Sequence, residues 1–183
     1  MEVRSLRIDG LKLFKPIVFH DDRGYFFESY KEPLFTSLGL PCFVQDNSSF
    51  SKQNVIRGLH YQDVPGQAKL ISCSRGKIFD VAVDLRPFSK TFGQWEAVIL
   101  DESNPSFFFI PIGFAHGYCA LSETALVHYR VSSLYDAAHE KSIRWNDPDI
   151  GIQWPVSEPI LSLRDQMSPF LHEVFGESVG YRS

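Results

Sequence analysis

The sequence predicts an all-β fold, either a sandwich or a barrel, and three observations support that prediction. Apolar residues recur with a period of two, most clearly from Phe79 to Leu85, which indicates a strand with one packed face. Turn signals separate many short apolar runs of this kind. Aromatic residues make up 14% of the chain and include 16 phenylalanines, which suits a β-rich core or a pocket that stacks a flat ligand.

The expected strands follow one another along the chain and are separated by turns. They lie at 11–19, 25–30, 42–48, 54–62, 68–73, 79–85, 94–100, 107–112, 114–121 and 124–132. The turn signals between them are Asp21-Asp22-Arg23-Gly24, Pro65-Gly66, Ser74-Arg75-Gly76 and Ser103-Asn104-Pro105.

Helical patterns are few and short. Lys31 to Leu38 predicts a short helix with Pro33 near its first turn, and Gln166 to Val174 predicts another. Residues 145–155 are rich in turn formers and are expected to be irregular. Because no linker or repeat divides the 183 residues, we expect one domain over 1–183, in which 145–183 is an irregular C-terminal segment with a short helix.

Charge and cysteine usage exclude several classes of protein. The net charge is −4 and no long run of Lys or Arg exists, so the electrostatic footprint of nucleic-acid binding is absent. No apolar stretch approaches the ~20 residues of a transmembrane helix, and none near the N-terminus has the length found in a signal peptide. Cys42, Cys73 and Cys119 are odd in number and widely spaced, so we expect reduced core thiols in a cytoplasmic protein.

The segment from Pro111 to His116 has the pattern P-x-G-x-x-H, which resembles the second signature of the cupin superfamily. Cupins are small jelly-roll barrels, also called double-stranded β-helices, in which this His usually holds a metal. Their first signature usually supplies H-x-H and a Glu seven residues before a Gly. Here His60-Tyr61-Gln62 stands at the H-x-H, and Lys69 stands seven residues before Gly76.

These departures change the expected chemistry. A protonated Lys cannot coordinate a divalent metal and Gln is a poor ligand, so with two of the four donors replaced we expect no metal and no cofactor. A neutral His can instead act as a general base, and a nearby ammonium can hold negative charge on an oxygen. His60 and Lys69 therefore suit proton abstraction next to a carbonyl. Tyr129 shares the strand parity of Val127 and Val131, so it is expected to point inward, where it can supply an acid.

A more specific resemblance covers residues 13 to 170, nearly the whole chain. Seven blocks occur in order: Phe43 to Asn47, Arg57 to Gln62, Lys69-Leu70, Asp80 to Arg86, Gly113 to Gly117, Trp145 to Pro148 and Leu161 to Asp165. This arrangement resembles the dTDP-4-dehydrorhamnose 3,5-epimerase family. The fold expected from the resemblance is a cupin jelly-roll barrel with a few short peripheral helices.

The resemblance also implies a role for each matching residue. His60 matches the proton acceptor, Asp165 the carboxylate that orients it, Lys69 the cation at the C4 oxygen, and Tyr129 the proton donor. The residues that match substrate contacts are Arg23, Glu28, Gln45, Asn47, Arg57, His116, Glu140 and Arg164. The resemblance further implies a homodimer in which residues 1–30 exchange between protomers, so that Arg23 and Glu28 reach the partner's site.

Residue patterns bear on several of these assignments independently. Gln45 and Asn47 share parity on one strand, so both can face a pocket. Arg57 has the opposite parity to His60, and we expect a bulge at Gly58 to bring both side chains to one face. The aromatic pair common in the family near 134–135 is Leu134-Tyr135 here, which removes one ring and makes Tyr135 a second candidate for the acid.

The expected function is inversion of C3 and C5 of a dTDP-linked 4-keto sugar through an enolate. Three alternatives stay open at this level. The first is an epimerase that acts on one carbon or on another nucleotide sugar, such as a GDP-linked one. The second is a metal-dependent cupin oxygenase or isomerase, and the third is a cupin that binds a sugar nucleotide without catalysis.

Overall fold

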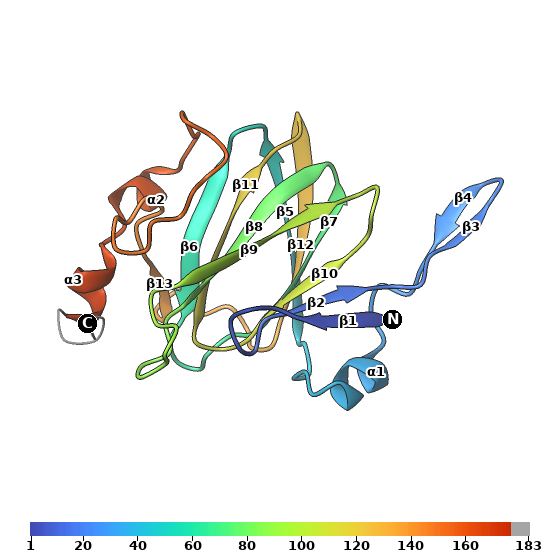
Figure 1. The fold of residues 1–183 in the computed structure, drawn as a ribbon, viewed down its shortest axis with the longest axis horizontal. Helices are drawn as coiled ribbons and strands as arrows, with labels where there is room; N and C mark the ends of the chain where they lie inside the picture. Colours follow the sequence, from blue (N-terminus) through green and yellow to red (C-terminus); the bar gives the residue numbers. More distant parts are fainter. Residues whose placement is uncertain (177–183) are drawn as a thin grey trace.

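Two antiparallel sheets pack face to face in the computed structural model, which describes residues 1–176 (Figure 1). The six-stranded sheet has the order β1 (Glu2–Ser5), β2 (Lys12–Lys15), β10 (Phe107–Ile110), β7 (Lys69–Arg75), β12 (Thr124–Val131), β5 (Gln45–Lys52). The five-stranded sheet has the order β13 (Glu140–Ser142), β6 (Ile56–Gln62), β11 (Phe114–Ala120), β8 (Lys77–Asp84), β9 (Trp95–Asp101).

The strand order confirms the prediction of a jelly roll. Strands β5 to β12 pair as β5-β12-β7-β10 in one sheet and as β6-β11-β8-β9 in the other. Most consecutive strands therefore lie in opposite sheets, which is the arrangement of two interlocked Greek keys. Each expected strand between 42 and 132 overlaps one of these eight elements.

Apolar side chains fill three layers rather than one. The central layer lies between the sheets and includes Ile71, Phe108 and Val127 from one sheet and Ile78 and Leu100 from the other. A second layer covers the outside of the six-stranded sheet, where the helix α1 (Glu32–Ser37) contributes Phe35. A third layer covers the outside of the five-stranded sheet beneath residues 143–175. The central strands of both sheets are thus covered on two faces, whereas most residues of the edge strands β1 and β5 are exposed.

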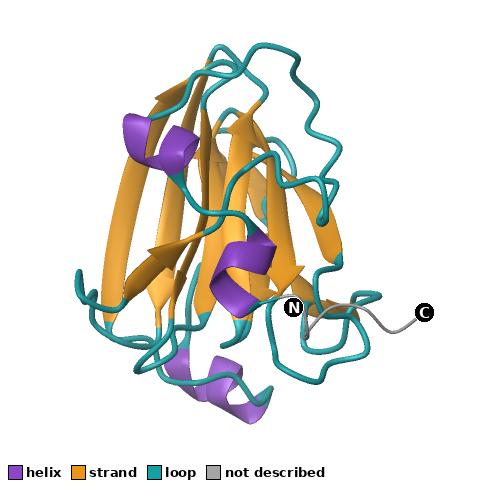
Figure 2. Cartoon of the chain, turned by 90° about the vertical axis from the view of Figure 1, so that its left-hand side faces the viewer, coloured by secondary structure: helices purple, strands orange, loops and turns teal. Residues whose placement is uncertain are grey.

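The expectation that the strand from Phe79 to Leu85 packs on one face only is wrong. Residues Val81 and Val83 face the outer layer and Ile78 and Ala82 face the central one, so nearly all of β8 is buried. The C-terminal segment causes this difference, because it lies across the outer face of the sheet (Figure 2). The acidic residues Asp80 and Asp84 of this strand are buried as well, and they share the parity of Ile78 and Ala82, which face the central layer.

The first expected helix is confirmed and the second is not. Helix α1 begins at Glu32 with Pro33 in its first turn, as predicted. The expected helix from Gln166 to Val174 is instead two helices, α2 (Leu163–Met167) and α3 (Leu171–Phe175). They are separated at Pro169, which lacks a backbone N–H and forces the preceding residue into an extended conformation.

Residues 145–155 form turns and irregular backbone, as expected. The rest of the expected C-terminal segment is described only as far as residue 176, so 177–183 lie outside the described residues. Within residues 1–176, no helix combines the length and the apolar character that crossing a membrane requires.

The N-terminal strands differ from the expected ones. Strand β2 covers only part of 11–19, because Pro16 follows it, and 25–30 contributes only to β4 (Gly24–Phe26). Strand β4 pairs with β3 (Phe19–Asp21) to form a hairpin that projects away from both sheets (Figure 1). Its aromatic side chains Phe19, Tyr25 and Phe26 are all more than half exposed.

The cysteines are all free thiols, but the expectation of three core thiols is wrong for one of them. Cys73 and Cys119 are buried, and burial raises the pKa of each thiol to about 11. Cys42 is exposed.

The expected bulge at Gly58 is confirmed. In the pairing of β6 with β11, His60 lies opposite His116 and Arg57 lies opposite Tyr118, so two residues of β6 face one of β11. Gly58 has a φ of +128°, and an added Cβ would lie 2.5 Å from the Cα of Gly117. Only glycine fits this position.

We therefore expect Gly58→Ala to destabilise the fold more than Gly24→Ala does. Gly24 has a similar φ of +133° but no atom within 4 Å of an added Cβ, so its variant isolates the cost of the backbone conformation, roughly 1–3 kcal/mol. Gly58→Ala should lose about 1–3 kcal/mol more because two backbones must separate. Urea unfolding measures both free energies, and equal losses for the two variants would contradict this account of the bulge.

Candidate active site

A cavity of about 620 Å³ opens between the two sheets and contains most of the expected site residues. Nine of the twelve line it: Asn47, Arg57, His60, Lys69, His116, Tyr129, Glu140, Arg164 and Asp165. They come from both sheets and from α2, so segments distant in sequence meet there.

His60 and Asp165 form the shortest polar contact of the expected catalytic residues. His60 Nε2 lies 2.6 Å from Asp165 Oδ1, and the Asp165 side chain is only 5% exposed. Burial raises the pKa of Asp165, but the hydrogen bond and charge of His60, together with hydrogen bonds from Ser162 and Gly58, bring that pKa below its ordinary value. An ionised carboxylate can only accept, so Nε2 carries the ring proton and Nδ1 is left as the basic nitrogen.

Local structure places Asp165 against the imidazole. The Ser162 side chain accepts a hydrogen bond from the Asp165 backbone N–H and so begins α2. The segment before α2 is tied to β6, because the Ile56 N–H donates to the Ile160 carbonyl at 3.0 Å. These contacts fix the carboxylate at the rim of the sheet that carries His60.

Lys69 is the first residue of β7, and its side chain lies inside the cavity, as predicted. Its Nζ donates to the His60 carbonyl at 3.2 Å, and the residue is only 9% exposed. Burial lowers the pKa of Lys69 to about 8, while the negative charges of Glu140 and Asp80 act in the opposite direction. The cavity therefore holds an ammonium at neutral pH.

Asp80 is a component of the site that sequence reasoning missed. Its Oδ1 lies 2.6 Å from His116 Nε2, and both residues are buried. Burial lowers the pKa of His116 and raises that of Asp80, and the His116 and Lys69 charges counter the rise for Asp80. Asp80 Oδ2 is buried without a hydrogen-bond partner among the described residues. The sequence did contain a signal for its inward direction, because Asp80 shares the strand parity of Ile78 and Ala82, which face the central layer.

Tyr129 points inward beside Val127 and Val131, as its parity predicts. Its hydroxyl lies 2.9 Å from Ser49 Oγ, and its ring meets the His116 ring edge to face at 5.9 Å. Burial raises the pKa of Tyr129 well above its ordinary value, so the phenol is protonated and can act as an acid.

Tyr135, the second candidate acid, also lines the cavity. It is half exposed, and its hydroxyl donates to Glu140 Oε2 at 3.2 Å. Glu140 also pairs with Arg164, so these three residues form a polar rim. Tyr129 is therefore the more deeply buried of the two phenols.

Gln45 and Asn47 lie on β5, and Arg57 on β6 contacts the far end of the same strand. Gln45 Nε2 donates to Asn47 Oδ1 at 2.8 Å, which fits their shared parity, although only Asn47 lines the cavity. The Arg57 side chain donates to Ser51 Oγ and to the Phe50 carbonyl. Several N–H groups of its guanidinium therefore stay available to an anion.

Arg23 and Glu28 do not line the cavity of their own chain. Arg23 sits in the turn of the β3–β4 hairpin and pairs with Asp21, while Glu28 pairs with Lys31. Figure 1 shows this hairpin extending away from both sheets.

The side chains at the positions of the cupin metal signature are engaged within the protein: His60 and His116 contact carboxylates, and Lys69 donates to a backbone carbonyl. Within the described residues, no group of three or more His, Cys, Asp or Glu side chains is arranged to hold a metal ion. Gln62, at the second position of the H-x-H pattern, instead donates to the Pro65 carbonyl at 3.0 Å and to Ser133 Oγ at 3.2 Å. It braces a loop.

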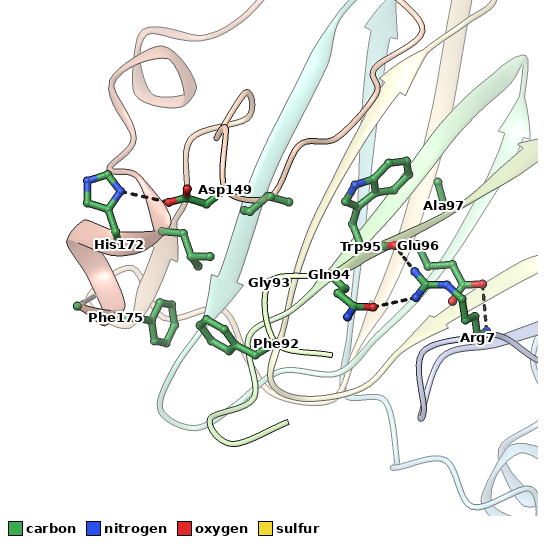
Figure 3. Close-up of a pocket in the computed structure, with 13 residues that line it drawn as sticks. Arg7, Phe92, Gly93, Gln94, Trp95, Glu96, Ala97, Asp149, His172 and Phe175 are labelled. Atoms are coloured by element: carbon green, nitrogen blue, oxygen red, sulfur yellow. Dashed lines mark hydrogen bonds and ion pairs between the residues drawn. The ribbon is translucent and has the colours of Figure 1, made fainter. Parts of the chain in front are cut away.

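A second cavity, of about 610 Å³, lies outside the five-stranded sheet between β9 and α3 (Figure 3). Its polar groups are paired with one another: His172 with Asp149, and Arg7 with Gln94. No expected site residue is found among the described residues that line it. The inner cavity is therefore the candidate active site.

Comparisons with known proteins agree with this site. The family model for dTDP-4-dehydrorhamnose 3,5-epimerase matches residues 5–173. A dTDP-4-dehydrorhamnose 3,5-epimerase from Methanothermobacter thermautotrophicus is 48% identical over 163 residues, which cover 87% of this chain and 88% of the relative. A dTDP-4-dehydrorhamnose 3-epimerase from Streptomyces niveus is 41% identical, and the match covers 94% of this chain and 85% of that protein.

A solved structure supports the fold as well as the sequence match. The dTDP-6-deoxy-D-glucose-3,5-epimerase from Legionella pneumophila, in complex with dTDP-4-keto-L-rhamnose, is 41% identical to this chain. It superposes with a TM-score of 0.93, and the match covers 100% of this chain and 99% of that structure. This chain belongs to the dTDP-4-dehydrorhamnose 3,5-epimerase family.

Proposed function

We propose that this chain inverts C3 and C5 of dTDP-4-dehydro-6-deoxyglucose and so produces dTDP-4-dehydro-L-rhamnose. One observation carries the proposal: a base and an acid enter a single cavity from opposite sheets. His60 lies on β6 of the five-stranded sheet and Tyr129 on β12 of the six-stranded sheet. Inversion of a carbon requires a proton to leave from one face and another to arrive on the opposite face, which this arrangement supplies.

His60 starts each inversion as the general base. Asp165 accepts the hydrogen bond from the Nε2–H group of His60, so Nδ1 is free to remove a proton next to the C4 ketone. The carboxylate also stabilises the imidazolium that forms. The first proton removed is that of C5, and C3 follows after the ring turns within the cavity.

Lys69 supports the resulting negative charge. Removal of a proton next to a ketone places charge on the ketone oxygen, and a fixed ammonium in a buried site stabilises it without reorganisation. Lys69 needs no metal for this role, because its own charge lies in the cavity that contains His60. We therefore propose catalysis without a metal or another cofactor.

Tyr129 completes the inversion by protonating the carbon from the second wall. Its pKa, raised by burial, keeps the proton on the oxygen until the enolate is present. Tyr135 is less suited to this step, since it is half exposed and its proton goes to Glu140.

The nucleotide supplies binding energy that positions the sugar. Asn47, Arg57, His116, Glu140 and Arg164 line the cavity and can contact the sugar or the diphosphate, and Gln45 holds Asn47 in place. The forked guanidinium groups suit a diphosphate better than a point charge does.

Arg23 and Glu28 act, in this proposal, at the site of a partner subunit within a homodimer. Exposed aromatic residues on both strands of the β3–β4 hairpin are costly for a monomer and suit insertion against a second copy. Both residues lie on or beside this hairpin. We propose the cytoplasm as the location, because free thiols are stable there.

A one-carbon epimerase is the second candidate function, and the similarity to the Streptomyces niveus 3-epimerase favours it. Both reactions use the same base, cation and acid, and they differ in whether the ring turns to present a second carbon. Product NMR separates the two and also tests other nucleotide sugars.

Incubation with dTDP-4-dehydro-6-deoxyglucose in heavy water should place deuterium at C3 and C5, with full activity in EDTA. His60→Ala should lower turnover roughly 10²–10⁴-fold while dTDP binding persists, because a general base contributes about this much. His139→Ala is the matched control, since His139 pairs with Asp63 on the surface. NMR follows exchange and inversion, and wild-type protein that exchanges neither carbon would reject the enolate scheme.

The reaction should slow in alkaline solution because Lys69 must be charged. Its pKa of about 8 means that the ammonium is present below this pH and lost above it, so kcat/KM should fall as pH rises through 8. Lys69→Met should lower kcat roughly 10²–10³-fold. Lys77→Met, at a surface pair with Asp101, is the control. A wild-type profile that stays flat to pH 10 contradicts the role of Lys69.

Exchange of the hairpin can be tested with a mixed dimer of Arg23→Ala and His60→Ala subunits, isolated through two affinity tags. If each hairpin serves the partner, one site carries both substitutions and the other carries neither, so about half of wild-type activity should return. If each hairpin serves its own barrel, every site carries one substitution and the mixed dimer stays inactive. Failure to isolate any dimer would also refute the proposal.

A further inference from the structure

Four hydroxyl groups and one guanidinium form a continuous chain along the wall of the cavity. Arg57 Nε donates to Ser51 Oγ at 3.0 Å, and Ser51 Oγ lies 2.7 Å from the Tyr118 hydroxyl. Ser49 Oγ lies 2.9 Å from the Tyr118 hydroxyl and 2.9 Å from the Tyr129 hydroxyl. The chain crosses between the sheets, because Arg57 and Tyr118 belong to one and the other three residues to the other.

The chemistry of arginine gives this chain a direction. A guanidinium can only donate, so Ser51 accepts from Arg57 and keeps its own proton to donate. Ser51 is 3% exposed, and within the described residues the only acceptor near its hydroxyl is Tyr118. Leaving that buried proton unpaired would cost the desolvation of a hydroxyl group.

The remaining protons follow from this start. Tyr118 accepts the hydrogen bond from Ser51 and donates one to Ser49. Ser49 donates in turn to Tyr129. The Tyr129 oxygen is thereby occupied as an acceptor, and its own proton is left to point into the cavity that it lines. If the hydroxyl groups donated in the opposite order, the Tyr129 proton would point to Ser49 and away from the cavity. The buried Ser51 proton would then have no acceptor among the described residues.

The chain also prepares the site for the charge left after proton transfer. Tyr129 becomes an anion when it protonates carbon, and that anion keeps the hydrogen bond from Ser49. Hydrogen bonds linked in series polarise one another, so the positive charge of Arg57 acts on the tyrosinate through three hydroxyls. The contact with Ser49 opposes the rise that burial causes in the pKa of Tyr129, whereas the proximity of Tyr118 adds to that rise, so any stabilisation of the tyrosinate is delivered through Ser49.

We propose that Tyr118, with Ser49 and Ser51, is a positioning residue that turns the Tyr129 proton toward the substrate and stabilises the tyrosinate that results. The proposal rests on the function proposed above, in which Tyr129 is the acid. In this role the Tyr118 hydroxyl acts through Ser49 rather than on the sugar, and the Tyr118 side chain is fully buried. No proton leaves the chain in this role, since the proton delivered to carbon is that of Tyr129.

The test compares Tyr118→Phe and Ser49→Ala with wild type in heavy water, with dTDP-4-dehydro-6-deoxyglucose as substrate. Both variants break the chain but keep the Tyr129 hydroxyl, His60 and Lys69. Enolate formation should persist while protonation from the Tyr129 side slows. We expect kcat for inversion to fall about 10-fold or more with KM unchanged, and substrate recovered with deuterium but without inversion should accumulate.

Two controls and the choice of two test variants make the result decisive. Tyr61→Phe removes a half-buried phenol from the outer layer and should behave as wild type. Ser49→Thr keeps the hydroxyl and should retain activity. Ser49→Ala alters a partly exposed strand residue, so it tests the chain even if Tyr118→Phe folds poorly.

The outcomes separate this proposal from the proposed function. An unchanged ratio of exchange to inversion in Tyr118→Phe and Ser49→Ala overturns the positioning role, whether their rates are normal or both processes slow together. Absence of deuterium exchange in wild type instead means that the enolate mechanism itself has failed.

Discussion

The buried ammonium of Lys69 is the interaction on which the rest of the site depends. Taking such a charge out of water is costly unless opposite charges and hydrogen bonds compensate it. Here the His60 carbonyl accepts from Nζ, and the charges of Asp80 and Glu140 oppose the fall in pKa that burial causes. These groups come from β6, β8 and β13, so one lysine fixes the relative positions of three strands besides its own. The same positive charge is what an enolate oxygen needs.

The jelly-roll topology gives the site its two walls. Because β6 and β12 belong to different sheets, His60 and Tyr129 approach the cavity from opposite directions without any special loop. The C-terminal segment adds what the barrel lacks. It covers the outer face of the five-stranded sheet and brings Asp165 to His60, which is 105 positions away in sequence. Packing of that outer layer therefore supports the alignment of His60, the proposed base.

Strand periodicity predicted much of the fold and the inward direction of Tyr129, because alternation reports which side chains share a face. The resemblance to the cupin signatures, rather than alternation, predicted that His60 and Lys69 share one pocket. The parity of Asp80 with Ile78 and Ala82 indicates its inward direction, but alternation could not show that its carboxylate pairs with His116, which lies on a different strand. The chain through Tyr118 was beyond reach for a related reason, since its members lie on four strands whose proximity only the sheet pairing reveals. Pro169 was a local signal for the break between α2 and α3, but the helical pattern of the flanking residues obscured it.

The most direct test of the account is a crystal structure of the His60→Asn variant with dTDP-4-dehydro-6-deoxyglucose bound. The distance between Lys69 Nζ and the C4 ketone oxygen decides the central claim. The account predicts a hydrogen bond of about 2.7–3.2 Å, with C3 and C5 lying between the walls that carry residues 60 and 129. A C4 oxygen more than about 4 Å from Nζ, paired with a different donor, would contradict it.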